Sequence, residues 1–216
     1  MKKERKYGLL SLGCLIAFVL WTIAVYTLDR QPIGPCDTVV GFAGMNGWAH
    51  HLTGVCMPIY TITDWLGLAP VAIGLGFAIL GLCQWVKRKH ILKVESNLLI
   101  LGVFYLVMLG VYLLFEMLVI NYRPVLIAGY LEVSYPSSTT LLTLCVMPTT
   151  LWQIRCRMKP SFFRRCLMAA IWLFMLFMVG GRLLAGVHWF TDIIGGGLLS
   201  AGLVLLYDVT CRLAEK

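Results

Sequence analysis

Long apolar runs dominate this chain and constrain its fold more than any other feature. Six of them approach the roughly 20 residues that a helix needs to cross a bilayer, at about residues 7–27, 64–86, 97–120, 139–155, 166–185 and 191–211. With 60% hydrophobic and 13% charged residues among 216, the chain has too little polar sequence to cover so many helices in water. The sequence therefore predicts one all-α integral membrane domain over residues 1–216, a six-helix bundle whose fourth run is the shortest.

The basic residues indicate how this bundle is oriented. Of the 18 lysines and arginines, 15 lie before the first run, between the second and third, between the fourth and fifth, or after the sixth. These positions share one side of the membrane, which the positive-inside rule identifies as the cytoplasmic side. We therefore expect a multi-pass cell-membrane protein with both termini in the cytoplasm. The sorting also explains the net charge of +8, so no nucleic-acid partner is predicted.

The outer segment between the first two runs, about Leu28–Thr63, is too long for a simple turn. Its centre, Met45–Val55, is predicted to form a short helix that lies in the membrane interface. The segment also carries Cys36 and Cys56. On an oxidising side of the membrane these two residues either form a disulfide or remain as thiols, and the sequence leaves both possibilities open.

Four ionisable residues stand at the edges of the apolar runs: Arg123, Arg182, His188 and Asp192. Charged groups so close to lipid are costly, which makes a functional site the default hypothesis. Two guanidinium groups can grip a tetrahedral anion, and an imidazole beside a carboxylate can act as a nucleophile or proton carrier. His188 and Asp192 are four residues apart, so a helix that begins near His188 would let the carboxylate fix the imidazole tautomer. These groups suit phosphoryl transfer on the outer side of the membrane.

A second polar group, Pro136 followed by Ser137, Ser138 and Thr139, precedes the fourth apolar run. Free backbone N–H groups at a helix start bind anions readily. Serine and threonine at such positions also cap helices routinely. Both uses share one geometry, so the sequence is compatible with a phosphate cradle, a helix cap, or the two together.

In combination, these residues resemble the motifs of the type 2 phosphatidic acid phosphatase superfamily, whose members are often six-helix membrane proteins. Arg182, His188 and Asp192 match the pattern Arg-x5-His-x3-Asp of its third signature. Arg123-Pro124 is similar to the end of the first signature, and Pro136-Ser137 to the start of the second. The resemblance covers about residues 116–192 in motif and most of the chain in topology.

The resemblance implies a role for each matched residue. His188 would attack phosphorus to form a phosphohistidine, and Asp192 would orient the imidazole. Phosphate oxygens would be held by Arg123, Arg182 and the region of Ser137, Ser138 and Thr139.

Four positions depart from the family pattern. Glu116 stands where the family usually has a lysine, and Gly181 where it has a serine. In the second signature, Ser138 stands in place of a glycine, and Thr139 in place of the histidine that protonates the leaving group. An alcohol cannot deliver a proton near neutral pH as an imidazole can, and general acid catalysis typically contributes about 10²–10⁴-fold. Glu116 adds a carboxylate near the expected phosphate, so anion affinity should fall unless Glu116 pairs with Arg123 or turns away.

Three explanations for Thr139 stay open. The one we favour is a leaving group that is itself a phosphate, as in an isoprenoid diphosphate, because it needs protonation far less than an alkoxide does. A second is an acid from elsewhere, with His50 and His51 of the outer segment or Glu116 as candidates. A third is that the site no longer hydrolyses anything, and the protein binds or moves a lipid.

The expected function is a phosphoric monoester or diphosphate hydrolase of lipid metabolism, acting on a phosphorylated or diphosphorylated lipid at the extracytoplasmic face. No cofactor or metal is expected, because arginines and helix N-termini supply the positive charge that a metal would otherwise provide. A lipid head-group phosphotransferase and a non-catalytic lipid-binding or transport protein are the alternatives.

Overall fold

Eight α-helices make up most of the chain in the computed structural model, which describes residues 2–214. Three isolated β-bridges and two short 3-10 helices, η1 (Pro35–Asp37) and η2 (Ile91–Lys93), lie in the connections between them. The α-helices are α1 (Lys2–Thr27), α2 (Ala43–Thr53), α3 (Met57–Leu66), α4 (Leu68–Arg88), α5 (Ser96–Met117), α6 (Ser138–Arg157), α7 (Phe162–Leu184) and α8 (Phe190–Ala214).

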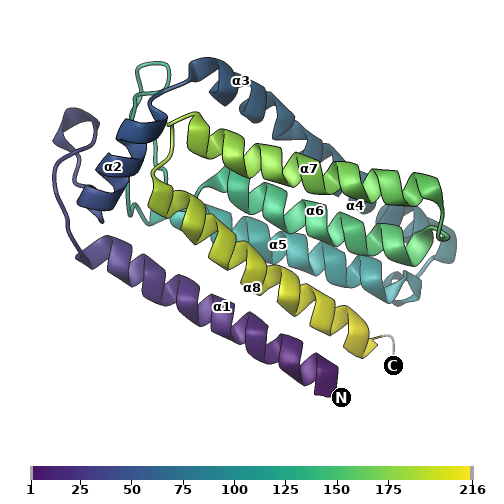
Figure 1. The fold of residues 1–216 in the computed structure, drawn as a ribbon. Coiled ribbons are helices and arrows are strands. Elements are labelled where there is room, and N and C mark those ends of the chain that lie inside the picture. The colour runs from purple at the N-terminus through teal and green to yellow at the C-terminus, as the bar shows by residue number, and fades with distance from the viewer. Residues whose placement is uncertain (1, 215–216) are drawn as a thin grey trace.

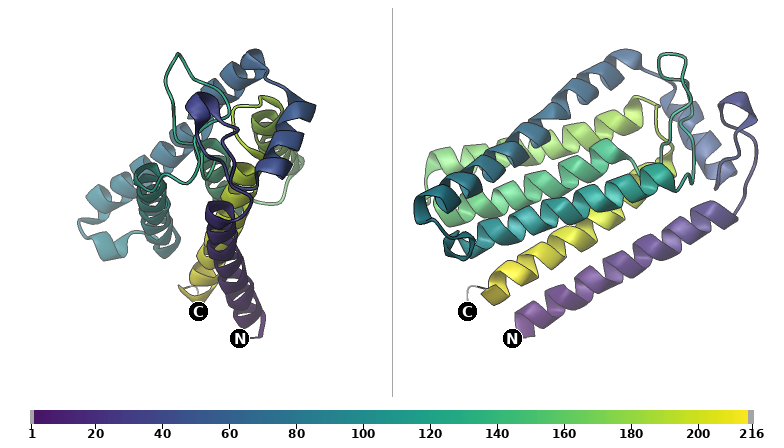
Figure 2. Two further views of the ribbon diagram at one scale, coloured as in Figure 1. Left: turned by 90° about the vertical axis from the view of Figure 1, so that its left-hand side faces the viewer. Right: turned by 180° about the vertical axis from the view of Figure 1, so that it is seen from behind.

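The long helices run roughly along one direction, and their connections gather at two ends (Figure 1). One end holds the described chain ends together with the α4–α5 and α6–α7 connections. The basic clusters that the sequence assigns to the cytoplasm therefore lie together there, apart from Lys216, which is outside the described residues. The other end holds α2, the connection over residues 118–137 and the α7–α8 connection, while α1 and α8 lie side by side along the bundle (Figure 2).

Five of the described helical segments are long and apolar enough to cross a membrane. Their outer surfaces agree with that assignment, because Leu75, Leu106 and Leu173 are 59%, 70% and 67% exposed. Apolar surface of this extent is unfavourable in water but suits contact with lipid. The chain is thus a multi-pass membrane protein.

The fourth predicted run corresponds to α6, which is not among those five segments. Helix α6 packs against α4, α5, α7 and α8, so its neighbours shield it from lipid. Its buried positions include threonines and Gln153, and the hydroxyls of Thr149 and Thr150 donate to backbone carbonyls one turn earlier. Because a shielded helix needs no apolar surface toward lipid, α6 is weakly apolar although its 20 residues span about 30 Å. A sixth crossing stays a prediction.

The second predicted run begins too late, because helical structure starts at Met57 and only Gly67 separates α3 from α4. The outer segment therefore ends near Cys56 instead of Thr63. Tyr60, Thr63 and Asp64 make α3 look like a polar loop in the sequence, yet α3 packs against α7 and buries Thr63 completely. Tertiary packing here outweighs the local polarity.

The rest of the outer segment carries the expected short helix, α2, whose depth in the interface stays a prediction. Cys36 and Cys56 are both free thiols in the structure. Asn46 ties α2 to the start of α8, because its side-chain amide donates to Thr191 Oγ1 at 3.0 Å and accepts from Thr191 N at 3.2 Å. Trp21 of α1 donates to the Thr191 carbonyl at 3.1 Å. These bonds fix the outer segment over the beginning of α8.

Gly186 is a position at this end of the bundle that tolerates almost no added volume. Its φ is +64°, and a Cβ there would lie 1.8 Å from the Gly54 carbonyl oxygen. We expect Gly186→Ala to destabilise the protein by about 2–5 kcal/mol, from left-handed backbone strain together with overpacking. Gly197→Ala is the matched control, because a Cβ at Gly197 meets nothing within 4 Å, and its effect should stay within about 1 kcal/mol. Thermal unfolding in detergent measures both, and equal midpoints would contradict this packing.

Candidate active site

The two arginines predicted from the sequence meet over one aromatic ring. Arg123 lies in the connection after α5 and Arg182 lies near the end of α7, yet both approach Tyr60 of α3. Their guanidinium carbons are 6.0 Å and 5.1 Å from the centroid of the Tyr60 ring. A tyrosine face attracts cations, so Tyr60 favours a position for both guanidinium groups at the same end of the bundle.

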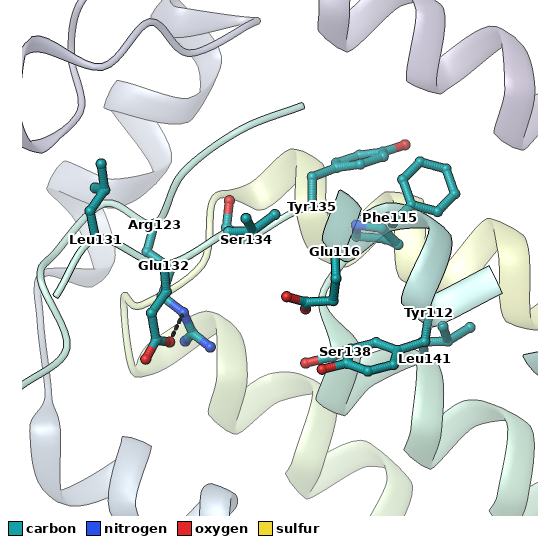
Figure 3. A pocket seen from close by; sticks show the side chains of 12 residues that line it. Tyr112, Phe115, Glu116, Arg123, Leu131, Glu132, Ser134, Tyr135, Ser138 and Leu141 are labelled. Carbon is teal, nitrogen blue, oxygen red and sulfur yellow. Dashed lines mark ion pairs between the residues drawn. The ribbon is translucent and has the colours of Figure 1, made fainter. Parts of the chain in front are cut away.

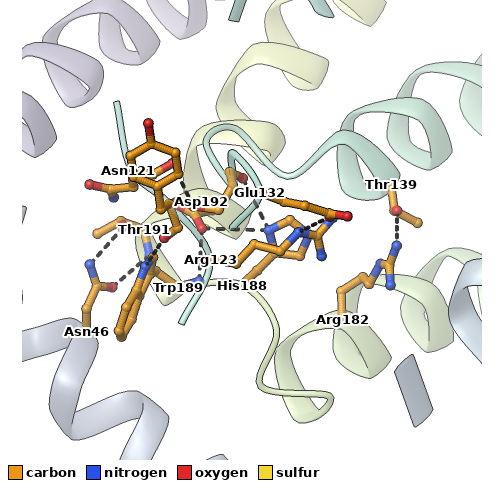
Figure 4. Close-up of polar contacts among 12 residues, drawn as sticks. Asn46, Asn121, Arg123, Glu132, Thr139, Arg182, His188, Trp189, Thr191 and Asp192 are labelled. Carbon is orange, nitrogen blue, oxygen red and sulfur yellow. Dashed lines mark hydrogen bonds and ion pairs between the residues drawn. The ribbon is translucent and has the colours of Figure 1, made fainter. Parts of the chain in front are cut away.

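Each guanidinium also has an acidic partner. Arg182 Nη2 is 3.0 Å from Asp64 Oδ1 and also donates to Thr139 Oγ1 (Figure 4). Arg123 Nε lies 2.9 Å from Glu132 Oε2. The arginine side chains are 2% and 10% exposed, whereas those of Asp64 and Glu132 are 57% and 43% exposed. The cations are therefore buried, while their carboxylate partners stand toward solvent and are free to exchange with another anion.

His188 lies between α7 and α8, and its ring nitrogens have different surroundings. Nδ1 is 3.2 Å from the Ser134 carbonyl oxygen, and because a carbonyl only accepts, Nδ1 carries the proton. Nε2 is buried without a hydrogen-bond partner, so its lone pair is unused. Burial lowers the pKa of His188 to about 4, an effect that the nearby Asp192 only partly offsets. A neutral imidazole with a free lone pair is the form required of a nucleophile.

The prediction for Asp192 needs a correction in geometry. Helix α8 begins at Phe190, so His188 lies two residues before the helix, and its expected contact with Asp192 forms across the helix start. Asp192 Oδ2 accepts from Trp189 N at 2.9 Å and lies 3.7 Å from His188 Nδ1. Asp192 thus closes the first turn of α8, in the manner of the acidic residue of a capping box, and supports the imidazole by charge. The Ser134 carbonyl makes the closer contact.

Several polar atoms around His188 are buried without hydrogen-bond partners. They include Arg123 Nη1, Arg182 Nε and Ser137 Oγ. A buried polar group left unpaired costs about 1–3 kcal/mol, and native structures keep few such groups without a reason. Two cationic forks, a hydroxyl and an imidazole lone pair together suit an oxyanion ligand such as phosphate.

The start of α6 lies beside these unpaired polar atoms. Ser137 is its N-cap residue, but the Ser137 side chain makes no cap hydrogen bond. The backbone N–H of Ser137 instead donates to the Asp192 carbonyl at 3.1 Å, which joins the beginnings of α6 and α8. The simple capping interpretation is therefore wrong for Ser137, and Thr139 is a partner of Arg182 within the first turn.

Two cavities adjoin the site and share part of their lining. The first, of about 500 Å³, is mainly polar and includes Arg123, Glu132 and Ser138 in its wall. The second, of about 420 Å³, is mainly apolar, lies between α4, α5 and α6, and has Asp64 and Thr139 at its polar end. Tyr112, Ser138 and Leu141 line both. A polar chamber that adjoins an apolar groove matches an amphipathic ligand.

The three candidates for a substitute acid lie in different places. His50 packs against the Trp189 ring at 5.6 Å between centroids, and burial lowers the pKa of His50, so the residue is neutral near pH 7 and a poor proton donor. His51 is exposed on α2 and is not part of the wall of either cavity. Glu116 lines the polar cavity, where Glu132 is the residue that pairs with Arg123.

Three residues of the site were missed by the sequence analysis: Tyr60, Asp64 and Glu132. Asp64 and Glu132 are ionisable groups beside apolar runs, so the criterion that selected Glu116 would have selected them too. Tyr60 has no local signal, because only the fold brings α3 against α7. The close packing of α3 against α7 also accounts for Gly181, because a Cβ at this position would lie 2.7 Å from Thr63 Cγ2 of α3. A serine at this position would collide with α3.

The low pKa of His188 gives a measurable expectation. The imidazole should stay neutral from pH 8 down to about pH 5, because its charged form gains population only near pH 4, whereas an ordinary histidine becomes charged below about pH 6.5. NMR titration of the four labelled histidines in detergent tests this, with His188→Gln to assign the signal. A His188 signal that titrates near pH 6.5 would show that the imidazole is not desolvated.

Comparison with known proteins agrees with the fold. No family model matches the chain, and no curated protein does so either. One solved structure is similar: the first transmembrane PAP2 type phosphatidylglycerolphosphate phosphatase from Bacillus subtilis, at 18% sequence identity and a TM-score of 0.58, over 95% of this chain and 96% of that chain. The chain therefore has the fold of a membrane PAP2-type phosphatase over nearly its whole length.

Proposed function

We propose that the protein is a membrane lipid phosphatase that hydrolyses a phosphorylated or diphosphorylated lipid through a phosphohistidine at His188. The observation that carries this proposal is the state of the imidazole: neutral, buried, held through Nδ1 by a backbone carbonyl, with the Nε2 lone pair free. A histidine that served only packing would be expected to pair both ring nitrogens.

In this reaction Nε2 attacks phosphorus, and the bond from phosphorus to the leaving oxygen breaks with its electron pair on that oxygen. Water then attacks the phosphohistidine and releases inorganic phosphate together with the free imidazole. Arg123 and Arg182 hold the phosphoryl oxygens, and the exposed carboxylates of Glu132 and Asp64 give up these cations as phosphate enters. Charge stabilisation of this kind is commonly the largest contribution to catalysis.

Thr139 has a different role from the histidine that stands there in the family pattern. Its hydroxyl oxygen accepts a hydrogen bond from Arg182, so Thr139 positions a cation and is not a proton donor to the leaving group. This agrees with the interpretation that the substrate has a leaving group which departs without a protein acid.

The apolar cavity between α4, α5 and α6 supports a lipid as the substrate, because its polar end reaches Asp64 and Thr139. A tail lying in this groove would leave the head group beside the two arginines. The basic clusters at the opposite end of the bundle favour an extracytoplasmic position for the site. No residue role in this proposal calls for a cofactor or a metal.

Removal of the imidazole is the direct test. Purified protein in detergent, offered phosphatidic acid and an isoprenoid diphosphate, should release inorganic phosphate, and His188→Ala should lower this release by at least about 10³-fold, because no nucleophile replaces Nε2. His90→Ala is the control, since His90 lies in the α4–α5 connection at the other end of the bundle. Phosphate release that survives His188→Ala would overturn the assignment.

Tyr60 offers a second test, because it contacts both cations without reaching the reacting atoms. Loss of the ring in Tyr60→Leu should cost about 1–2 kcal/mol for two cation–π contacts, which corresponds to an increase in KM of about 5- to 30-fold. Tyr60→Phe keeps the ring and should stay within about twofold of the wild type. If both variants lose activity equally, the hydroxyl and not the ring is the important group.

A further inference from the structure

We propose that the polar cavity beside the arginines binds a protonated amine of the substrate, so that the preferred substrate is a lipid phosphate that carries an ammonium group near its phosphate. Glu116 and Glu132 are the residues that would hold the ammonium. The inference rests on the proposed function and narrows it.

The cavity brings its charged groups to face one another. Arg123 and Glu132 lie on one side, and Glu116, Tyr112 and Ser138 lie on the other, with their polar ends directed inward (Figure 3). The Tyr112 hydroxyl is within electrostatic range of all three charged residues of this wall. The cavity volume of about 500 Å³ leaves room for a small head group between the two sides.

The two arginines suit a phosphate, but the carboxylates around them leave little net positive charge at this end of the bundle. Arg123 and Arg182 are its two cations, His188 is neutral, and the carboxylates are Asp64, Glu132, Asp192 and, across the cavity, Glu116. A phosphate monoester adds about −1.5 to −2 at neutral pH. Repulsion between Glu116 and such an anion would weaken binding, and a diphosphate would add still more negative charge. A substrate that carries its own cation removes this conflict.

A second observation identifies the anionic half of the same ligand. Arg123 is buried, lines the cavity, and its Nη1 has no hydrogen-bond partner. This donor requires an acceptor such as a phosphate oxygen, whereas the Glu116 carboxylate on the opposite wall accepts a hydrogen bond from Tyr112 and has oxygen lone pairs left for a further donor. The Arg123 donor and the Glu116 acceptor, set on opposite walls of the cavity, fit a zwitterion with its phosphate toward Arg123 and its ammonium toward Glu116.

A metal ion fits this wall less well. No group of three or more histidine, cysteine, aspartate or glutamate residues with a metal-binding arrangement is found among residues 2–214. Two carboxylates with hydroxyl oxygens from Tyr112 and Ser138 supply acceptors for the three N–H donors of an ammonium group.

The ammonium would also offset the absence of a histidine at Thr139. When the amine lies two carbons from the leaving oxygen, its positive charge stabilises the alkoxide that forms as the bond to phosphorus breaks. A leaving group made more acidic in this way needs less help from a protein acid. One property of the substrate then explains both the carboxylate at Glu116 and the alcohol at Thr139.

A matched pair of lipids tests the inference: a long-chain 2-aminoalkyl phosphate and its N-acetyl derivative, which has the same chain but no positive charge. Phosphate release by the full-length protein at pH 7 should give a kcat/KM about tenfold higher for the free amine. Glu116→Gln should bring this ratio to about threefold or less. Glu116→Lys should bring it below one, because a lysine repels the ammonium and attracts the phosphate.

Asp37→Asn is the control, since Asp37 is an exposed carboxylate of the outer segment that is not part of the cavity wall, and it should leave the ratio as in the wild type. A ratio near one in the wild type, or an equal fall in the control, would overturn the inference. So would activity that is lost with a chelator and restored by a divalent cation, because the carboxylates would then hold a metal.

The two proposals fail in different ways. If the wild type releases phosphate from both lipids equally, the amine site is wrong and the phosphatase assignment stands. If neither lipid is hydrolysed, the phosphatase assignment fails, and the amine preference is then measured by the rise in unfolding temperature that each lipid produces. Equal rises would overturn the amine site as well.

Discussion

The site depends on keeping two guanidinium groups charged and close together at the edge of an apolar bundle. Arg182 is almost completely buried, and removing one partner from a buried ion pair typically costs about 3–5 kcal/mol. This cation is stabilised by three groups: the Tyr60 ring, the Asp64 carboxylate and the Thr139 hydroxyl oxygen. Because Asp64 and Glu132 are the exposed members of their pairs, the phosphate of the proposed substrate could replace them without uncovering the arginines.

Much of the fold could be predicted from the sequence, because a helix that faces lipid has to present apolar side chains along its length, and this rule makes such helices easy to recognise. The runs that correspond to α1, α5, α7 and α8 were found within a few residues, and all four have outward-facing apolar side chains. The rule weakens where a helix does not face lipid. Helix α6 is surrounded by other helices and can be rich in threonine, and α3 hides Thr63 against α7, so its polar sequence resembled a loop.

The candidate site could be predicted only in part. Ionisable residues at the ends of apolar runs can be recognised in the sequence, but the partners that the fold brings to them cannot. Arg123, Arg182, His188 and Asp192 stand out individually as ionisable residues at the ends of apolar runs. Their partners are set by contacts across the fold: Ser134 orients His188 from the connection after α5, and Tyr60 reaches both arginines from α3. Asp192 illustrates the limit of spacing as a guide. The interval of four residues suggested a pair within the helix, but α8 begins two residues after His188, so the carboxylate accepts from the backbone of Trp189 at 2.9 Å and lies 3.7 Å from the imidazole.

Two of the departures from the family pattern, Gly181 and Thr139, are connected through α3. The close approach of α3 leaves no room for a side chain at Gly181, because Thr63 occupies that space. The same helix brings Asp64 to Arg182, and Arg182 in turn engages Thr139. A histidine at residue 139 would have to share the buried space between Arg182 and α3, with Gly67 already close to the Thr139 methyl group. The way in which this chain holds its second arginine thus leaves little space for a protein acid at residue 139, and in the proposed reaction the leaving group would have to depart without one.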